Sequence, residues 1–412
     1  MNFIILGITL INPFIGFLMA LLGIYGDRKH WRTYIFCMSL FFANLSYCYT
    51  PESVHPDLYR YFEYIFRLRG RSLAETVSYG YQGTKLYVFS FFVWIANLFQ
   101  DEHLVPFFSV LLVYYIAFYC TCFMGEREKI KWKFVCTYLV FQMMTLDWYS
   151  LTNNVRNVAA FAVIGFAIFR DTYVGKKDLL TLICYVAPIF VHPTSLIFVL
   201  VRIVLAFIKT NKMRVILLAV TILINLIVEL LEKNINLITD NYVIQYLIRK
   251  AYNYLFDTNS AYGLAVQASL RSSITRILYL TLAVLFVLMF FVLLYNKTKN
   301  RREVAFQNVL EKYQTFIMVL ALMALACSTM LRPEYWRFTA ALIIFGSGIV
   351  LLFMGLPRNI ISQLLKNLFL VLTVMCFFIW GYQFSYFNYK KLIVDMMLNS
   401  PIIVAIQHLI RL

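Results

Sequence analysis

Charged residues are scarce in this chain. Only 14% of its 412 residues are Asp, Glu, Lys or Arg, whereas 62% are hydrophobic. A soluble domain is roughly a quarter charged and about half apolar, so the composition excludes a soluble globular protein. We therefore predict an all-α, polytopic membrane protein with about 11–13 transmembrane or re-entrant helices. No polar stretch is long enough for a separate soluble domain, so residues 1–412 are predicted to form a single membrane domain.

The usual signatures of nucleotide, metal and disulfide chemistry are also missing. There is no P-loop and no G-x-G-x-x-G after a predicted strand, which argues against ATP-driven or nucleotide-bound chemistry. The eight cysteines lack C-x-x-C spacing with histidine partners, so they are predicted to be small core residues, with no cofactor or metal. They are Cys37, Cys48, Cys120, Cys122, Cys136, Cys184, Cys327 and Cys376.

The net charge of +17 comes mainly from short basic loops between apolar runs, so it indicates membrane orientation rather than nucleic-acid binding. Basic clusters at 26–32, 126–133, 170–177 and 297–302 are predicted to be cytoplasmic. The N-terminus is then outside, and the external loops are 50–84, 232–272 and 331–337. The first apolar run, Phe3 to Tyr25, has no basic n-region or cleavage site, so it is predicted to be a retained helix.

Two segments complicate this topology. The apolar runs 86–99 and 104–124 join an external loop to a cytoplasmic one, so both cannot cross fully; we expect the shorter, 86–99, to re-enter or lie at the interface. The alternative places the 50–84 loop inside. Within that loop, Asp57 to Leu68 has the pattern of an amphipathic surface helix. The tail, 389–412, is predicted to be interfacial, with a final crossing as the alternative.

Residues 179–208 have basic flanks at both ends, which indicates two short helices that meet at a turn. His192-Pro193 is the natural position for that turn, because proline is favoured at the start of a helix. The pair is predicted to be re-entrant, with His192 in a cavity open to the outside. One kinked span is the alternative.

Arg156 is the most informative single residue. It lies in L-T-N-N-V-R-N-V-A-A, residues 151–160, which is predicted to open a long apolar helix near its outer end. Asn153, Arg156, Asn157 and Ala160 would share one face of that helix. A charged group at the bilayer centre costs roughly 2.5–3.5 kcal/mol on insertion scales. The arginine therefore either snorkels to the interface or serves a function.

Several further arginines fall on the predicted outer surface, against the positive-inside bias. The set is Arg60, Arg156, Arg271, Arg276, Arg332 and Arg337. The planar guanidinium suits phosphate, so the set predicts an anionic ligand such as a lipid-linked phosphate or pyrophosphate in the outer leaflet. Pairing with Asp57, Glu63, Glu334 and lipid headgroups is the alternative.

Transfer of a group from a phosphate leaving group to a hydroxyl needs a base for the acceptor as well as cations for the leaving group. The candidates for the base are Asp57, Glu63 and His192. Nearby tyrosines could stack on sugar rings or belong to an interfacial aromatic belt. They are Tyr59, Tyr61, Tyr64, Tyr79 and Tyr81.

Four short motifs follow one another along the chain: D-x-x-R-Y from Asp57, G-Y-Q from Gly80, N-x-x-R-x-x-A from Asn153 and H-P-x-S from His192. In order and spacing they resemble the EpsG/Wzy-type polysaccharide polymerase family of bacteria. The resemblance is best over residues 1–210, and the C-terminal half matches mainly through the arginines near 332.

This resemblance implies a metal-independent glycosyltransferase at the outer face of the bacterial cytoplasmic membrane, and it is compatible with a GT-C-like architecture. It would join oligosaccharide repeat units carried on undecaprenyl pyrophosphate into a surface polysaccharide, alongside a flippase and a chain-length regulator. Asp57, Arg60, Glu63 and His192 would be catalytic. Substrate binding would fall to Tyr61, Asn153, Arg156, Asn157, Arg271, Arg276, Arg332, Glu334 and Arg337.

Two other functions remain open from the sequence. A flippase for lipid-linked oligosaccharides should carry charged residues along a path that both membrane faces can reach. The charges predicted here cluster outward, with Arg202 as the main exception. An O-antigen ligase-like transferase would use the same phosphate chemistry on a different acceptor.

Overall fold

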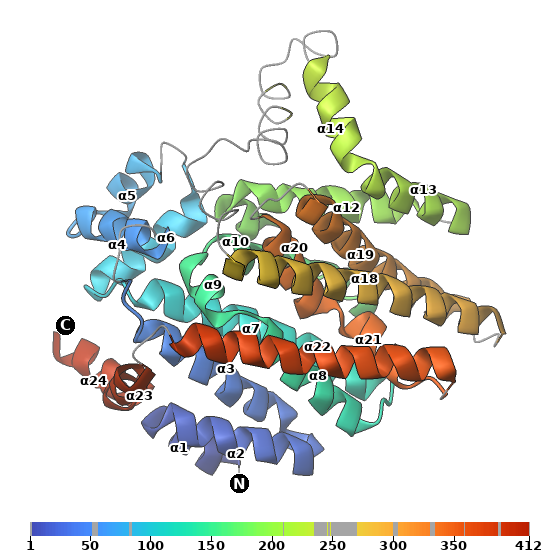
Figure 1. Cartoon of the computed structure of the whole chain (residues 1–412). Coiled ribbons are helices and arrows are strands. Elements are labelled where there is room, and N and C mark those ends of the chain that lie inside the picture. Colours follow the sequence, from blue (N-terminus) through green and yellow to red (C-terminus); the bar gives the residue numbers. More distant parts are fainter. Residues whose placement is uncertain are drawn as a thin grey trace. The chain divides into compact units, whose positions relative to one another are not determined.

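The computed structural model describes residues 2–51, 57–81, 85–208, 210–234, 245, 248, 270–299, 304–329, 334–357, 359–385 and 389–411. Every regular element among them is a helix (Figure 1). Five helices are long and apolar enough to cross a membrane, or up to seven if two bent pairs each count as one span. The prediction of an all-α, multi-pass membrane protein is thereby confirmed. The larger number of crossings and re-entrant segments stays a prediction, and most of the 232–272 loop lies outside the described residues.

The helices pack as two compact units. The first comprises Met1–Leu200 and Thr373–Leu412, and the second comprises Val201–Leu372. Two such units can belong to one membrane domain, so the prediction of a single domain stays a prediction. The residues that gather around Arg156 all lie in the first unit.

The core of the first unit is built on α7 (Leu104–Arg127), against which α3 (Trp31–Tyr47) and α10 (Asn157–Ile168) pack. Phe42 of α3 stacks on Tyr114 of α7 with ring centroids 4.1 Å apart. The Tyr114 hydroxyl donates to the Leu146 carbonyl oxygen at 2.7 Å, which ties α8 (Trp132–Thr145) to the same helix. Buried aromatic packing with satisfied hydroxyls gives α7 a fixed position.

The first apolar run is not one helix, contrary to the prediction for Phe3 to Tyr25. Helix α1 (Asn2–Ile11) ends before Pro13, and α2 (Pro13–Gly26) begins there. Proline lacks the N–H that a continuous helix would need, and the Asn12 side chain accepts from the Ile15 N–H at 3.1 Å. Each piece is shorter than a bilayer crossing, since 14 residues of α2 rise about 21 Å.

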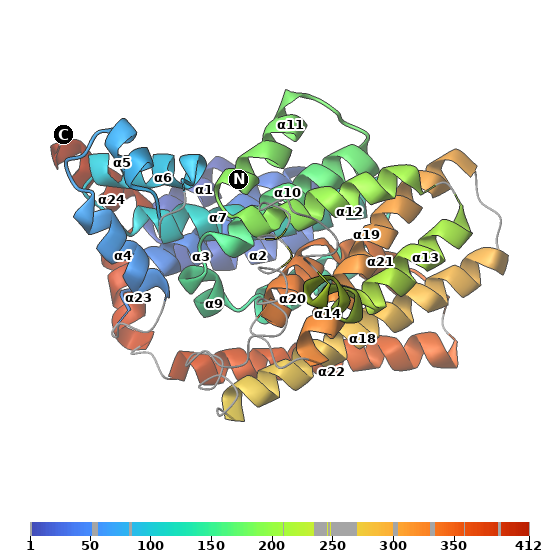
Figure 2. The ribbon, with the colours of Figure 1, turned by 90° about the horizontal axis from the view of Figure 1, so that it is seen from above.

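Three short helices, α4 (Asp57–Arg67), α5 (Leu73–Tyr79) and α6 (Tyr87–Leu98), lie together at one end of the first unit (Figures 1 and 2). Helix α4 buries an apolar face that includes Tyr61 and Tyr64, and it exposes its charged face, so an amphipathic helix forms where the sequence predicted one. Helix α6 rises only about 18 Å over its 12 residues, less than the roughly 30 Å hydrocarbon core. Whether it crosses stays a prediction.

A helix break occurs at His192, between α11 (Leu179–Val186) and α12 (Leu196–Phe207). Short 3-10 turns, η3 (Ala187–Phe190) and η4 (Pro193–Ser195), flank it, and the His192 N–H donates to the Pro188 carbonyl oxygen at 2.8 Å. Both turns contact α10. The re-entrant path that we predict for this segment has no test in these contacts.

The C-terminal helices α23 (Tyr389–Leu398) and α24 (Pro401–Arg411) pack on α3 and α1. The Asn44 side chain donates to the Met396 carbonyl oxygen at 3.2 Å, and His408 lies 3.0 Å from the Asp101 carboxylate. The tail is therefore fixed to the first unit by buried polar contacts.

The second unit centres on α19 (Val304–Thr329), which packs against α13 (Asn211–Ile222), α18 (Leu270–Lys299), α20 (Glu334–Phe345) and α21 (Ser347–Met354). Among the described residues, it also contains α14 (Ile224–Lys233), the second half of α12 and the first half of α22 (Ile360–Ser385). The Tyr313 hydroxyl donates to the Phe345 carbonyl oxygen at 3.0 Å, and Arg214 forms a half-buried ion pair with Glu311.

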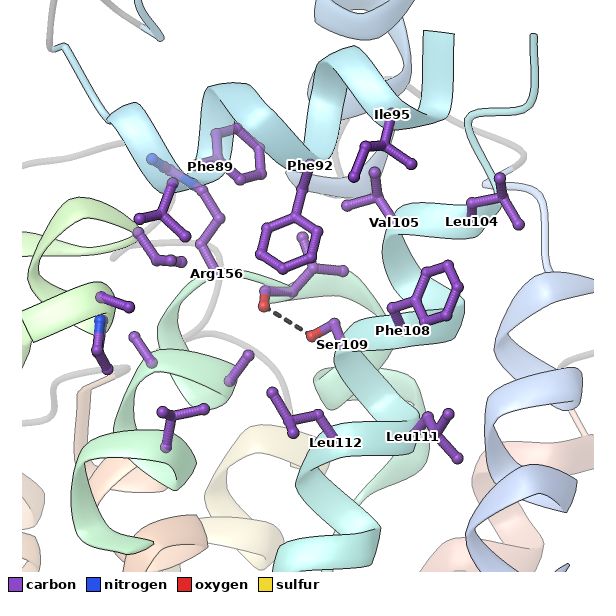
Figure 3. Close-up of a pocket in the computed structure, with 18 of the residues that line it drawn as sticks. Phe89, Phe92, Ile95, Leu104, Val105, Phe108, Ser109, Leu111, Leu112 and Arg156 are labelled. Atoms are coloured by element: carbon purple, nitrogen blue, oxygen red, sulfur yellow. Dashed lines mark hydrogen bonds between the residues drawn. The ribbon is translucent and has the colours of Figure 1, made fainter. Parts of the chain in front are cut away.

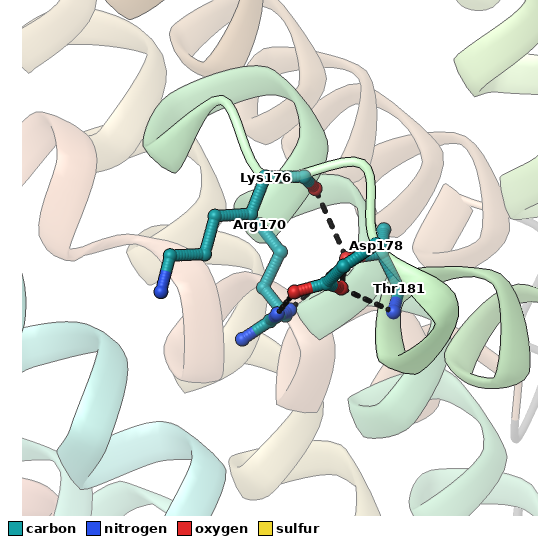
Figure 4. Close-up of polar contacts among 4 residues, drawn as sticks. All are labelled: Arg170, Lys176, Asp178 and Thr181. Carbon is teal, nitrogen blue, oxygen red and sulfur yellow. Dashed lines mark hydrogen bonds and ion pairs between the residues drawn. The ribbon is translucent and has the colours of Figure 1, made fainter.

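The loop after α10 is fixed by Arg170 and Asp178 (Figure 4). A π-helical turn, η2 (Phe169–Val174), extends α10, and the Arg170 guanidinium then donates to the Asp178 carboxylate at 2.5 Å. The same carboxylate accepts from the backbone N–H of Thr181 at 3.0 Å, which caps α11. One acidic side chain thus joins two apolar helices.

This loop should make stability depend on pH. The Thr181 N–H and the Arg170 guanidinium hold the pKa of Asp178 well below its usual range. An aspartate whose pKa is lower in the folded protein than in the unfolded chain stabilises the fold at pH values above its unfolded pKa of about 4. This stabilisation is lost as the pH falls from there toward the pKa of the folded protein. Between about pH 5 and pH 3, Asp178→Asn should therefore lose less thermal stability than the wild type. The melting temperatures of the wild type and of Asp178→Asn would be measured in detergent across this pH range. If both fell equally with pH, Asp178 would not have this role.

Candidate functional site

Arg156 lies in a break between two helices, not inside one. The structure ends α9 (Trp148–Asn153) before it and begins α10 just after it, so the continuous helix predicted over residues 151–160 is wrong. An asparagine pair stands at the break: the Asn153 and Asn154 side chains donate to the carbonyl oxygens of Tyr149 and Ser150, one turn earlier, at 2.9 and 3.1 Å. Such bonds compete with helical backbone pairing.

The Arg156 guanidinium contacts an aromatic cluster through the rings of Tyr61, Tyr81 and Phe89, and Tyr64 packs against the last two. Its Nε donates to the Tyr61 hydroxyl oxygen at 3.0 Å. Its central carbon lies 4.1 Å from the Tyr81 ring centroid, 5.1 Å from that of Phe89 and 5.2 Å from that of Tyr61. The four rings are buried and contact one another. Cation–π contacts on several rings orient the guanidinium without neutralising it.

The charge of Arg156 has no acidic partner in the part of the chain that the structure describes, since no carboxylate there lies within 4 Å of it. Arg156 also occupies the N-cap position of α10, and its side chain does not cap the helix. The positive end of the helix dipole therefore adds to the guanidinium charge. A cation beside a helix N-terminus is a suitable site for an anion.

Gly80 sets the position of Tyr81. It ends α5 with φ 61° and ψ 165°, a backbone region that is essentially limited to glycine. This conformation turns the chain so that the Tyr81 ring lies over Arg156. The G-Y-Q motif thus has a physical reason for its first two residues, whereas Gln82 lies outside the described residues.

Gly80→Ala should cost about 1–3 kcal/mol of stability, because alanine is strained at this φ, and it should displace Tyr81 from Arg156. Gly70→Ala is the matched control: Gly70 also has a positive φ, 75°, but a Cβ there meets nothing within 4 Å. Thermal unfolding should show losses in both variants. Any activity that depends on Arg156 should fall only in Gly80→Ala. An equal fall in both variants would show that the position of Tyr81 does not matter for the site.

Asp57 and Arg60 lie close to this cluster. They pair with each other at 3.5 Å on α4, and both side chains are more than a third exposed. Burial is the main cause that raises the pKa of the Tyr81 phenol, and the charges of Arg156, Asp57 and Arg60 all act on it as well. Asp57 and Tyr61 are four residues apart on α4, so Asp57 lies one helical turn from the tyrosine that bonds to Arg156. Glu63, by contrast, faces Arg67 at 3.8 Å on the exposed side of α4.

Asn153 and Asn157 flank Arg156, and both are buried with a side-chain oxygen that has no hydrogen-bond partner among the described residues. His192 is buried on the turn against α10, where it shares a hydrogen bond with the Thr194 hydroxyl. The structure brings Arg156, both asparagines and Tyr61 together. It places His192 on a neighbouring turn.

The remaining predicted site residues belong to the second unit. Arg276 of α18 and Arg337 of α20 are half-buried there. The side chains of Arg271 and Glu334, and all of Arg332, lie outside the described residues. Their predicted role at the same ligand therefore stays a prediction.

An apolar chamber of about 760 Å³ borders Arg156 (Figure 3). Helices α6, α7 and α10 and the η3 turn form its walls. Figure 3 shows Arg156 reaching toward α6 beside Phe89, while Phe92 points between the helices. The chamber was not predicted from the sequence, because apolar residues that line a cavity have the same pattern as residues in a packed core.

Phe89 was also missed. The sequence offers Tyr61, Tyr64 and Tyr81 as platforms for sugar rings, whereas Tyr61 and Tyr81 contact Arg156 and Tyr64 packs behind them. The spacing of Tyr61 and Tyr64 places them on one helix face, which is a usable signal. Phe89 offered none, because its partner lies 67 residues away along the chain.

Comparison of the chain with protein-family models, with curated proteins and with solved structures gave no match. The functional argument therefore depends on the site itself.

Proposed function

We propose that the chain is a membrane glycosyltransferase that joins lipid-pyrophosphate-linked oligosaccharide repeat units into a polysaccharide. The observation that carries this proposal is Arg156: a cation in contact with three aromatic rings at a helix N-terminus, with no acidic partner among the described residues. A guanidinium in this state attracts phosphate oxygens, because its planar fork can donate two parallel hydrogen bonds.

In the proposed reaction, an acceptor sugar hydroxyl attacks the anomeric carbon of the donor glycan. The new C–O bond forms as the bond between that carbon and the pyrophosphate oxygen breaks. The hydroxyl proton passes to the Asp57 carboxylate, and the charge of the leaving pyrophosphate is stabilised by Arg156. Arg60, paired with Asp57, would orient the carboxylate. Glu63 faces Arg67 on the exposed side of α4 and is less well placed, and His192, on the turn against α10, is the alternative base.

The same proposal places the site at the outer face of the bacterial cytoplasmic membrane, with undecaprenyl pyrophosphate as the lipid carrier. It rests there on the distribution of basic loops and on the resemblance in motif order. A flippase and a chain-length regulator are the partners that such an enzyme would need.

The test is incubation of the purified protein with repeat units linked to polyprenyl pyrophosphate, followed by gel separation of the glycans. A polymerase should produce a ladder of lengths that differ by one repeat unit. A flippase would move the substrate between leaflets of a vesicle without lengthening it, and an O-antigen ligase-like transferase would need a different acceptor. Unchanged glycan length with rapid translocation would reject the proposal.

A further inference from the structure

The walls of the chamber beside Arg156 are almost wholly apolar. Among the polar side chains that line it, the Ser109 hydroxyl already donates to the Val155 carbonyl oxygen at 2.7 Å (Figure 3). Ser109 therefore presents little polarity to an occupant. Arg156 is the one charged residue in the lining that the structure describes. Such a chamber suits an amphiphile with an apolar chain and an anionic head.

The chamber follows one face of α10. Its lining includes Arg156, Ala159, Ala160 and Val163, which recur at i, i+3, i+4 and i+7 and so form one stripe. This stripe runs about 10 Å along the helix axis. The two alanines leave room where larger side chains would fill the space. An occupant with its head at Arg156 would therefore extend its chain along this stripe toward Val163.

The opposite walls carry large apolar side chains that the protein itself leaves partly uncovered. Phe92 is 43% exposed and Phe108 is 46% exposed, although both line the chamber. Covering such surface with an apolar chain is favourable. The chamber volume lies within the roughly 300–1,000 Å³ range of small-molecule pockets, which is too small for a long polyprenyl chain as a whole.

We infer that the chamber binds the isoprenoid segment nearest the pyrophosphate of the lipid-linked substrate, with the rest of the chain in the bilayer. This inference rests on the proposed function for the identity of the head group. The branched isoprenoid chain is the one occupant that joins directly to a pyrophosphate at Arg156. A phospholipid acyl chain in the same place is the outcome that would overturn it.

The test measures displacement of labelled farnesyl pyrophosphate from the protein in nanodiscs. Competitors are inorganic pyrophosphate and the geranyl, farnesyl and geranylgeranyl pyrophosphates. Affinity should rise with chain length until the chamber is full. Val163→Phe and Ala159→Phe should lower the affinity for geranylgeranyl pyrophosphate about tenfold, because this corresponds to the loss of one or two buried methylene groups. Neither variant should change the affinity for inorganic pyrophosphate. Ala74→Phe, on the exposed face of α5, should change neither.

Phe92→Ala provides a second variant that cannot overfill the chamber, and it should shift the preference toward the longer chain. The inference would be overturned if all competitors bound with equal affinity. It would also be overturned if phospholipid displaced the label and if Val163→Phe and Ala159→Phe bound the competitors as the wild type does. Polymerisation is measured on the same samples. If binding depends on chain length but no glycan ladder forms, the proposed function is rejected and the role of the chamber is kept. If Val163→Phe and Ala159→Phe both produce a normal ladder, the role of the chamber is rejected and the proposed function is kept.

Discussion

Arg156→Ala should lower the rate of polymerisation by about 10²–10³-fold, the cost of removing one preorganised group that stabilises developing negative charge. The protein should still insert and fold, because Arg156 makes no ion pair with a described carboxylate and its backbone lies between helices. Cells that depend on the variant should accumulate single repeat units on their lipid carrier. Gel separation of the extracted glycans measures this directly.

Two companion variants sharpen this result. Arg156→Lys keeps the charge but loses the planar fork and the bond from Nε to Tyr61, so it should restore only a small part of the activity. Arg67→Ala removes an exposed arginine that pairs only weakly with Glu63, and it should leave the rate unchanged. If Arg156→Ala still produced polysaccharide of normal length, the guanidinium would have no role in the mechanism.

Asp57→Asn should reduce the rate by about 10²–10⁴-fold, since an amide cannot accept the proton of the attacking hydroxyl. Asparagine keeps the shape of the side chain and can still contact Arg60, so substrate affinity should change little. The effect should therefore fall on kcat rather than on KM. Initial rates with purified lipid-linked repeat units at several substrate concentrations separate the two.

Glu63→Gln is the matched control on the same helix. Its carboxylate faces Arg67 on the exposed side of α4, so its removal should leave kcat near the wild-type value. If Glu63→Gln lost most of its kcat while Asp57→Asn kept normal activity, Glu63 rather than Asp57 would be the base. A loss in His192→Asn alone would move the base to the turn against α10.

Sequence reasoning reached the helical class and singled out Arg156, because apolar runs and a charge within them are local signals. It missed the helix break at 154–156. The two consecutive asparagines could have predicted that break, but the apolar periodicity was given more weight than asparagine's tendency to bond to nearby backbone. The same error joined α1 to α2 across Pro13.

The surroundings of Arg156 could not be read from the chain. Tyr61 and Phe89 reach it only because α4 and α6 pack together, and no sequence pattern fixes such contacts between distant segments. The Gly80 conformation is an intermediate case, since a glycine before an aromatic residue indicates a turn without specifying what the ring will cover. Predictions for Arg271, Arg276, Arg332 and Arg337 depend on long-range placement of the same kind.

The most direct test of the central claim is the stoichiometry of the purified protein with its lipid-linked substrate. Each glycosidic bond formed should release one molecule of polyprenyl pyrophosphate, measured by thin-layer chromatography beside the glycan ladder. Release and ladder should fall together in Arg156→Ala. A ladder without released polyprenyl pyrophosphate, or release without any lengthening of the glycan, would contradict a lipid pyrophosphate as the leaving group held by Arg156.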